Sequence, residues 1–316
     1  MIDFRYHLVS LVAVFLAIAL GVVIGTTASD AAVPADAGRP AAAAEGERGA
    51  LEDRVAALEG RLATAEDFEQ AVAPALVRGS LAGRSVLLLA TGEDVPAERV
   101  RQVATLVTDA GGTVGGVVRL TAGYTDPAGA TGLRTYVTSP GIPAGVQLPT
   151  TDDAGQLVAA LLAQSLTVPE PGAAAPDPAA ASSVLAGLAA LEVLSVETPT
   201  VTPADSVVVL TGAGPASEDA AERTATLVEL VTALDAAGSG AVVAGPSAAA
   251  EGSGLVAAVR AAREVSAVVS TVDDVERASG RISTVLAVAQ EALGTSGAYG
   301  AGEGTRPVPP VPAATP

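Results

Sequence analysis

Two similar segments decide the fold, Ser85-Val-Leu-Leu-Leu-Ala90 and Ser206-Val-Val-Val-Leu-Thr211. Each is a short, continuous apolar run followed by turn residues, which is typical of a strand buried on both faces of a sheet. The same pattern follows both segments, namely a helical pattern (97–110 and 220–234) and a further apolar run (113–120 and 241–244). A strand, a helix and a strand of these lengths predict a right-handed parallel crossover unit in each half.

These two units predict an α/β domain over residues 84–294, with a Rossmann-like parallel sheet covered by helices. The halves, about 84–167 and 205–294, share the start of their helices, because Ala97-Glu98-Arg99 recurs as Ala221-Glu222-Arg223. Both an internal duplication and two similar units in an alanine-rich chain are compatible with this recurrence. Between and after the units we expect helices at 152–165, 182–194, 255–262 and 280–293 and a strand at 266–271.

The N-terminal segment Leu8–Ala28 is apolar throughout and contains no charged side chain. As a helix it reaches about 31 Å, roughly the thickness of the hydrocarbon core of a bilayer. Arg5 and His7 precede it, and acidic Asp30 follows it, so we expect residues 1–7 to be cytoplasmic and the remainder extracytoplasmic. The alternative is a cleaved signal peptide, although such signals have a shorter apolar core of about 7–15 residues.

The region between the span and the domain is predicted to be a spacer (29–47) and then a coiled coil (48–78). Its apolar residues follow a heptad spacing, in which Glu69 interrupts one core position: Leu51, Val55, Leu58, Leu62, Ala65, Val72 and Leu76. The alternative is a single amphipathic helix packed on the following domain.

In the span, Gly21 and Gly25 form a small-xxx-small pattern that allows close helix approach, so we expect a homo-oligomer. Residues 295–316 are rich in Gly and Pro and are predicted to be a disordered tail.

The composition excludes most catalytic constellations. The chain has no Cys, and its single His is His7, beside the predicted span. Nucleophile–histidine pairs and most zinc sites are therefore excluded from the exported domain, and we expect no enzyme activity and no cofactor. A formal net charge of −18 at pH 7 argues against nucleic acid as a partner.

Two short segments are candidates for a binding site. Gly212 and Gly214 follow a predicted parallel strand, where open α/β sheets bind ligands, but a tight turn is the favoured explanation for them. Asp273 and Asp274 also follow a predicted strand. Two adjacent carboxylates can contribute to a cation site, but two alone make a poor cage, and a helix cap or loop structure is the favoured explanation.

Several segments along the chain resemble the actinobacterial MctB family, named for mycobacterial copper transport protein B. They are Met1-Ile-Asp-Phe-Arg-Tyr-His-Leu-Val-Ser10, Ala13–Ala17, Gly83–Val86, Ala110–Gly112, Val269–Asp274, Gly280–Ile282 and Tyr299-Gly300. This resemblance implies copper transport or efflux, a role in copper homeostasis and a place in the cell envelope, with the outer envelope included.

The residues themselves identify no copper ligands. Cu(I) prefers thiolate and thioether and Cu(II) prefers imidazole, whereas this chain has only Met1 and His7 of these types. Copper is therefore expected as a partner through the resemblance alone. The alternative function is a noncatalytic envelope scaffold or ligand-sensing module that acts on copper only indirectly.

Overall fold

The computed structural model describes residues 14–18, 39–143, 145–169 and 174–310, and the chain divides into two compact units, residues 1–64 and residues 65–316. The predicted membrane span Leu8–Ala28 lies outside the described residues except for 14–18, which are helical, and Gly21 and Gly25 lie outside them too. Among the helices that are described, none combines the length and apolar character that a membrane crossing requires.

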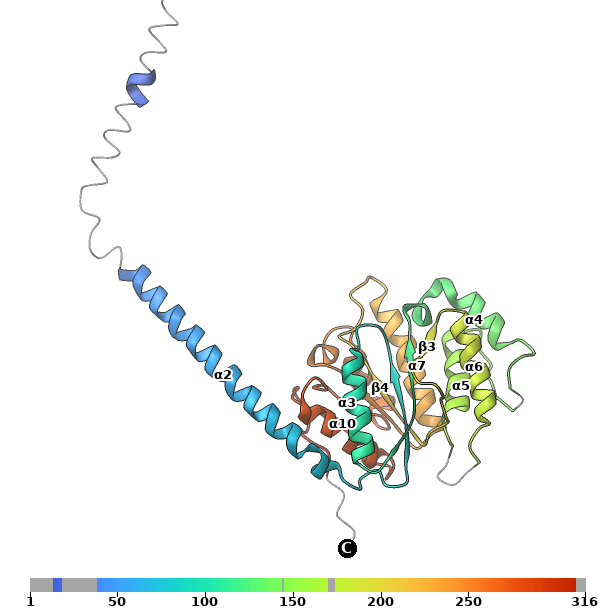
Figure 1. Cartoon of the computed structure of the whole chain (residues 1–316). Helices are drawn as coiled ribbons and strands as arrows, with labels where there is room; N and C mark the ends of the chain where they lie inside the picture. The colour runs from blue at the N-terminus through green and yellow to red at the C-terminus, as the bar shows by residue number, and fades with distance from the viewer. Residues whose placement is uncertain (1–13, 19–38, 144, 170–173, 311–316) are drawn as a thin grey trace, which may run out of the picture. The chain divides into compact units, whose positions relative to one another are not determined.

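The helix α2 is continuous from Arg39 to Val77 (Figure 1). It begins inside the region 29–47 that the sequence predicts to be a spacer, so that prediction is wrong for residues 39–47. The physical reason is local: Pro40 suits the first turn of a helix, and the alanines that follow are the strongest helix formers.

The end of α2 packs on the α/β domain of its own chain. Ala73 and Val77 are buried there, while the heptad residue Leu76 is 47% exposed. In this last part of the predicted coiled coil 48–78, the packed face is therefore displaced from the heptad stripe. Here the alternative interpretation holds, in which the helix packs on the domain that follows it.

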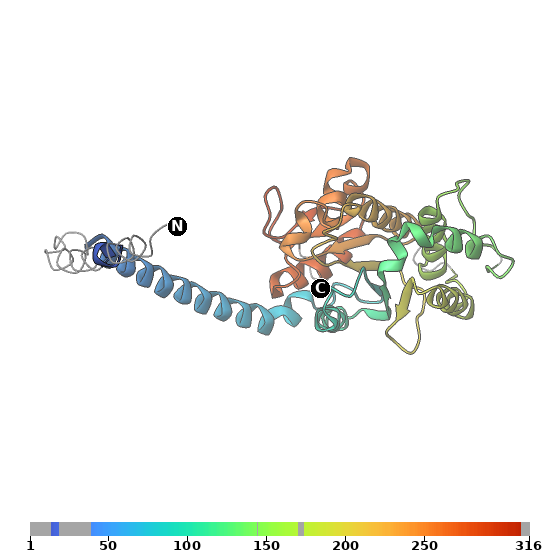
Figure 2. The same cartoon turned by 90° about the horizontal axis from the view of Figure 1, so that it is seen from above.

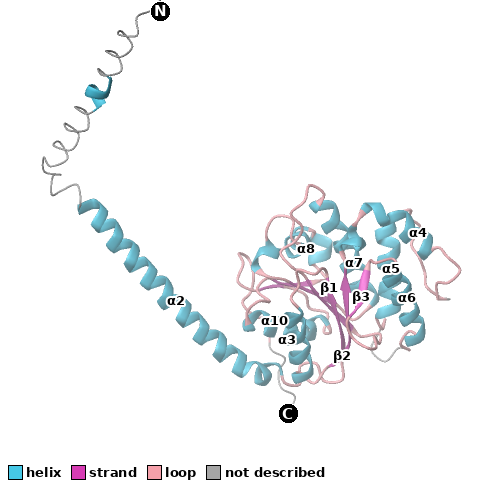
Figure 3. Ribbon diagram, turned by 45° about the horizontal axis from the view of Figure 1, so that its top comes forward, coloured by secondary structure: helices cyan, strands magenta, loops and turns pink. Residues whose placement is uncertain are grey.

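The domain is built on a seven-stranded sheet in the order β3-β2-β1-β4-β5-β6-β7 (Figure 3). Its strands are β1 Ser85–Ala90, β2 Thr113–Leu120, β3 Leu194–Val196, β4 Ser206–Leu210, β5 Ala241–Ala244, β6 Ser270–Val272 and β7 Ala298–Tyr299. All neighbours are parallel except β2 and β3. The predicted α/β architecture is confirmed, but the sheet is mixed rather than wholly parallel.

The antiparallel edge arises after α6 (Pro178–Ala190). The sequence predicts a helix up to residue 194, but the helix ends earlier and Glu192 adopts a positive φ of 59°. This left-handed conformation reverses the chain, and β3 then runs back along β2. The alanine-rich sequence of α6 contains no residue pattern that predicts its end at Ala190.

Both predicted crossover units are present. The first is β1-α3-β2 with α3 at Ala97–Asp109, and the second is β4-α7-β5 with α7 at Ala220–Ala237. Strands β1 and β4 are direct neighbours, and from them the two units extend in opposite directions across the sheet. The boundary between β1 and β4 is therefore a topological switch point, the place where open α/β sheets commonly bind ligands.

Helices cover both faces of the sheet (Figure 1, Figure 2). Along β1, Leu87 and Leu89 belong to one core cluster and Val86 and Leu88 to the other, because successive side chains of a strand point to opposite faces. The remaining helices are α4 Ala130–Val137, α5 Ala154–Leu166, α8 Leu255–Ala261, α9 Arg263–Ser266 and α10 Ala278–Glu291, with single turns η1 Ala122–Thr125, η2 Pro127–Gly129 and η3 Ser247–Ala250. The first core is covered by α5, α6, α7 and α8, and the second by α3, α10 and the end of α2.

The C-terminal part differs from the sequence prediction in two places. The strand expected at 266–271 is shorter, because α9 occupies its start and β6 begins at Ser270. Residues 295–310 of the predicted tail belong to the fold: β7 pairs with β6, Tyr299 is fully buried, and Gln290 Nε2 donates to the carbonyl of Pro310 at 2.9 Å. Tertiary packing thus orders a segment whose composition alone suggests disorder.

Candidate functional site

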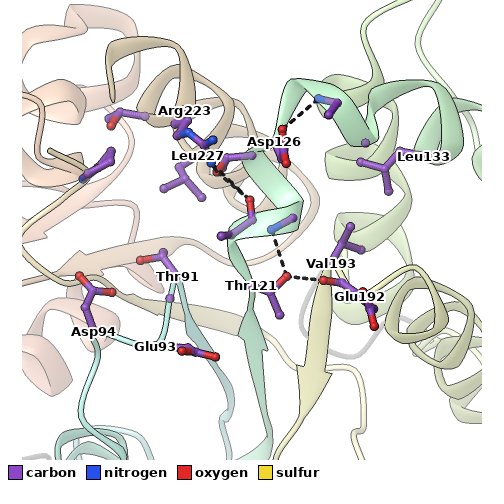
Figure 4. Close-up of a pocket in the computed structure, with 18 of the residues that line it drawn as sticks. Thr91, Glu93, Asp94, Thr121, Asp126, Leu133, Glu192, Val193, Arg223 and Leu227 are labelled. Carbon is purple, nitrogen blue, oxygen red and sulfur yellow. Dashed lines mark hydrogen bonds between the residues drawn. The ribbon is translucent and has the colours of Figure 1, made fainter. Parts of the chain in front are cut away.

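A cavity of about 830 Å³ lies at the C-terminal ends of β1, β2 and β4, at the switch point (Figure 4). Its walls come from three parts of the chain that follow strands: the loop after β1, the segment from β2 through α4, and the β4 exit with the start of α7. The turn after α6 closes the side next to β3. Its polar and charged lining residues are Thr91, Glu93, Asp94, Thr121, Thr125, Asp126, Glu192, Thr211, Arg223 and Thr224.

Hydroxyl and backbone hydrogen bonds hold these walls together. Thr91 Oγ1 donates to Thr211 Oγ1 at 3.1 Å, which joins the exits of β1 and β4. The hydroxyl of Thr121 donates to the carbonyl of Glu192 and accepts from Gly123 N at 3.2 Å, as Figure 4 shows. The left-handed residue Glu192 is thereby fixed in the cavity wall, in a conformation that costs a non-glycine residue about 1–2 kcal/mol.

Arg223 joins α7 to the wall formed by η1. Its Nε donates to Asp219 Oδ2 at 2.7 Å, and its Nη1 lies 3.4 Å from Thr125 Oγ1. The charge of this guanidinium is therefore already balanced by Asp219. Among the described residues that line the cavity it is the single base, against the four carboxylates of Glu93, Asp94, Asp126 and Glu192.

The lining of this cavity is built mainly of hydroxyls and carboxylates. None of its described lining residues is a His or a Lys, so the groups beside the paired threonine hydroxyls are carboxylates and one guanidinium. The excess of carboxylates disfavours an anion, so the cavity suits a polar molecule that is neutral or positively charged.

The structure separates the two candidate glycines. Gly214, with φ of +99°, lines the cavity, whereas Gly212 lies behind its wall in a smaller cavity of about 340 Å³. A Cβ at Gly212 would overlap the carboxylate of Asp94, so a larger residue at position 212 would displace the Asp94 side chain. Sequence reasoning missed the walls at 91–94, 121–133 and 191–193. The first two of these walls could have been predicted from the sequence, because both follow apolar runs that predict parallel strands.

Asp273 does not line the cavity and is engaged within the protein. It is 1% exposed, and its Oδ2 accepts from Arg260 Nη1 at 2.7 Å. Its Oδ1 accepts from the backbone N–H of Ala301 at 2.8 Å, and the N–H of Gly302 approaches both oxygens. Its lone pairs are thus used to hold the loop that follows β7.

Asp274 is buried beside it and does not line the cavity either. Burial, together with the nearby carboxylates of Asp273 and Glu276, raises its pKa to about 6. A carboxyl whose charged form is disfavoured is a poor cation ligand. Across the described ranges, no group of three or more His, Cys, Asp or Glu side chains is arranged to hold a metal ion.

Comparison with known proteins gives one consistent result. The family described as "Copper transport outer membrane protein, MctB" matches residues 1–310. Proteins named copper transporter MctB from Mycobacterium tuberculosis (strain H37Rv) and Mycobacterium bovis are 33% identical over 251 residues, which cover 78% of each chain. The protein of that name from Mycobacterium leprae is 32% identical over 266 residues, which cover 80% of this chain and 81% of its own.

Proposed function

Because this chain belongs to the MctB family of copper transport proteins, we propose that it is a membrane-anchored envelope protein of copper homeostasis. Membership of the family supports a role in copper transport or homeostasis and a place in the envelope. The anchor, its orientation and the way in which the chain acts on copper are the parts that we add.

In the proposed topology, Leu8–Ala28 is an uncleaved anchor with residues 1–7 in the cytoplasm. The support is its charge-free length and the basic residues that precede it. Fractionation of cells that express the full chain with a C-terminal tag tests this topology. We expect the tagged protein in the membrane fraction, with the original N-terminus by sequencing and the tag accessible to protease from outside the membrane. A mature N-terminus at Gly38, after the small-residue segment Ala35-Asp36-Ala37, would instead identify a cleaved signal.

The domain is proposed to act on copper without binding the metal. From residue 8 to residue 316 the chain contains no Cys, Met or His, so it lacks the thiolate, thioether and imidazole ligands that copper prefers. A carrier or channel lining would need such groups along its path. We therefore assign copper movement itself to a partner.

The observation that carries this proposal is the cavity at the switch point. Its lining of threonine hydroxyls and carboxylates suits a small polar molecule that is neutral or cationic, and none of its described lining residues is a His or a Lys. The domain then acts as a noncatalytic ligand-sensing module or scaffold whose occupancy affects the copper-handling partner.

Copper content of cells tests this proposal. Deletion of the gene is expected to raise cell-associated copper. Expression of the wild-type chain or of the His7→Ala variant is expected to return the copper content to its original level. Ala122→Trp, which places a large side chain in the cavity, is expected to be stable but to restore copper content poorly. The matched control is Ala261→Trp at an exposed position away from the cavity.

Each contrary outcome has a distinct meaning. An unchanged copper content after deletion contradicts the copper role. Loss of function in His7→Ala alone points to direct ligation near the N-terminus, and full function of Ala122→Trp removes the cavity from the proposal.

A further inference from the structure

The helix α2 carries a stripe of exposed apolar side chains. Leu51, Val55, Leu58 and Leu62 recur with 4-3-4 spacing, and each is 46–61% exposed. These four residues, called the α2 stripe, lie on one face of the continuous helix drawn in Figure 1. A row of large aliphatic side chains in contact with water is unfavourable unless another surface covers it.

We propose that the α2 stripe forms a parallel two-stranded coiled coil with a second copy of this chain. In the heptad set by the stripe, Val55 and Leu62 occupy position a, and Leu51 and Leu58 occupy position d. A β-branched residue at a and Leu at d is the combination that favours two strands in parallel. This inference does not depend on the role in copper homeostasis.

The charges beside the α2 stripe favour a second copy of this chain as the partner, in the parallel orientation. Arg54 occupies position g and Glu59 the following position e, the two positions that pair between parallel chains. In an antiparallel pair, Arg54 would instead face another g position and Glu59 another e position, which brings like charges together.

Neither residue has an opposite charge to pair with along its own helix. Three and four residues away from Arg54 are Ala50, Leu51, Ala57 and Leu58, and the corresponding neighbours of Glu59 are Val55, Ala56, Leu62 and Ala63. Glu52, by contrast, accepts from Arg48 at 2.8 Å within the helix. Arg54 and Glu59 are therefore available to form ion pairs with a second chain.

The contact between the two copies along the α2 stripe, called the seam, ends where α2 begins to contact its own domain. Glu66 Oε1 accepts from Arg281 Nη2 at 3.0 Å and from Ala278 N at 2.8 Å, and beyond it Ala73 and Val77 are buried in the domain core. The seam is therefore short, about two heptads, where a stable coiled coil commonly needs about three to four. We expect a weak dimer that forms at high local concentration.

Single-cysteine variants of the full chain test the dimer directly, because the natural chain contains no Cys. Leu51→Cys and Leu62→Cys lie at the two ends of the seam, and Asp53→Cys on the outer face is the control. After oxidation with diamide at high protein concentration, we expect disulfide-linked dimers from both seam variants, several-fold above the control. Positions 51 and 62 are about 16 Å apart along the helix, so an antiparallel pair would link only when the two variants are mixed.

Exchange of the charges at positions 54 and 59 tests the ion pair that favours the parallel orientation of the two helices. Arg54→Glu and Glu59→Arg, each added to Leu62→Cys, are expected to lower the association constant by about three- to tenfold. The double exchange restores the opposite charges and is expected to recover the cross-linked fraction. The proposal is overturned if the seam variants link no better than Asp53→Cys, if linkage requires mixing, or if the double exchange does not recover it.

Discussion

Replacement of Asp273 by Ala is expected to destabilise the α/β domain by about 3–5 kcal/mol, the usual result of removing one partner from a buried ion pair. The variant leaves Arg260, whose side chain is only 20% exposed, without its carboxylate. It also removes the acceptor of the Ala301 and Gly302 amides, so the loop after β7 loses its attachment. Thermal unfolding of the full chain measures the effect, and we expect a midpoint lower by roughly 10 °C.

Two variants control this experiment. Glu303→Ala removes an exposed carboxylate from the same loop and is expected to leave the midpoint almost unchanged. The double variant Asp273→Ala/Arg260→Met removes both charges and is expected to be more stable than Asp273→Ala alone, because no unpaired buried charge remains. If Asp273→Ala unfolds like wild type, its carboxylate does not hold this loop and a ligand role has to be reconsidered.

Replacement of Glu66 by Ala is expected to detach the end of α2 from the domain. Glu66 Oε1 accepts from Arg281, which is 5% exposed, and from the N–H of Ala278 at the start of α10. The residue before that helix, Arg277, provides no side-chain cap, so a carboxylate from α2 performs this function. We expect a loss of about 2–4 kcal/mol, from the unpaired guanidinium and the lost cap together.

Hydrogen exchange measures this effect locally. In Glu66→Ala, amide exchange within residues 66–77 is expected to become faster, while β1 and β4 in the sheet centre stay protected. Asp67→Ala, at an exposed neighbouring position, is the matched control and is expected to exchange like wild type. Glu69→Ala, which removes the acceptor of Ser279 N at 3.1 Å, is expected to give a smaller effect. Unchanged exchange in Glu66→Ala would show that apolar contacts alone hold the helix end.

Local patterns in the sequence were sufficient for the two crossover units. Apolar runs such as Ser85–Ala90 and the helical periodicity after them depend on neighbouring residues alone, so they were readable without a structure. The similar start of both helices then indicated that β1 and β4 are each the first strand of their crossover unit. Long-range pairing was not readable in this way, because β3 and β7 are only three and two residues long and depend on the strands beside them.

The candidate site was only partly predictable. Gly214 was found because it follows an apolar run, but the opposite wall around Thr121 and Glu192 depends on how β2, α4 and the turn after α6 meet. Asp273 illustrates the opposite difficulty. Its sequence pattern is compatible with a cation ligand but favours a structural carboxylate, and Arg260, 13 residues away, is the partner that gives it a structural role.

The sequence by itself determined the α/β class, the crossover units, the scarcity of copper ligands and the heptad stripe of α2, because these follow from composition and short-range periodicity. Only the tertiary structure decided which part of that stripe remains exposed, where the sheet becomes antiparallel, and which side chains form the cavity at the switch point. These features depend on contacts between residues far apart in the chain, such as Glu66 with Arg281, and a single sequence contains no local signal for such contacts.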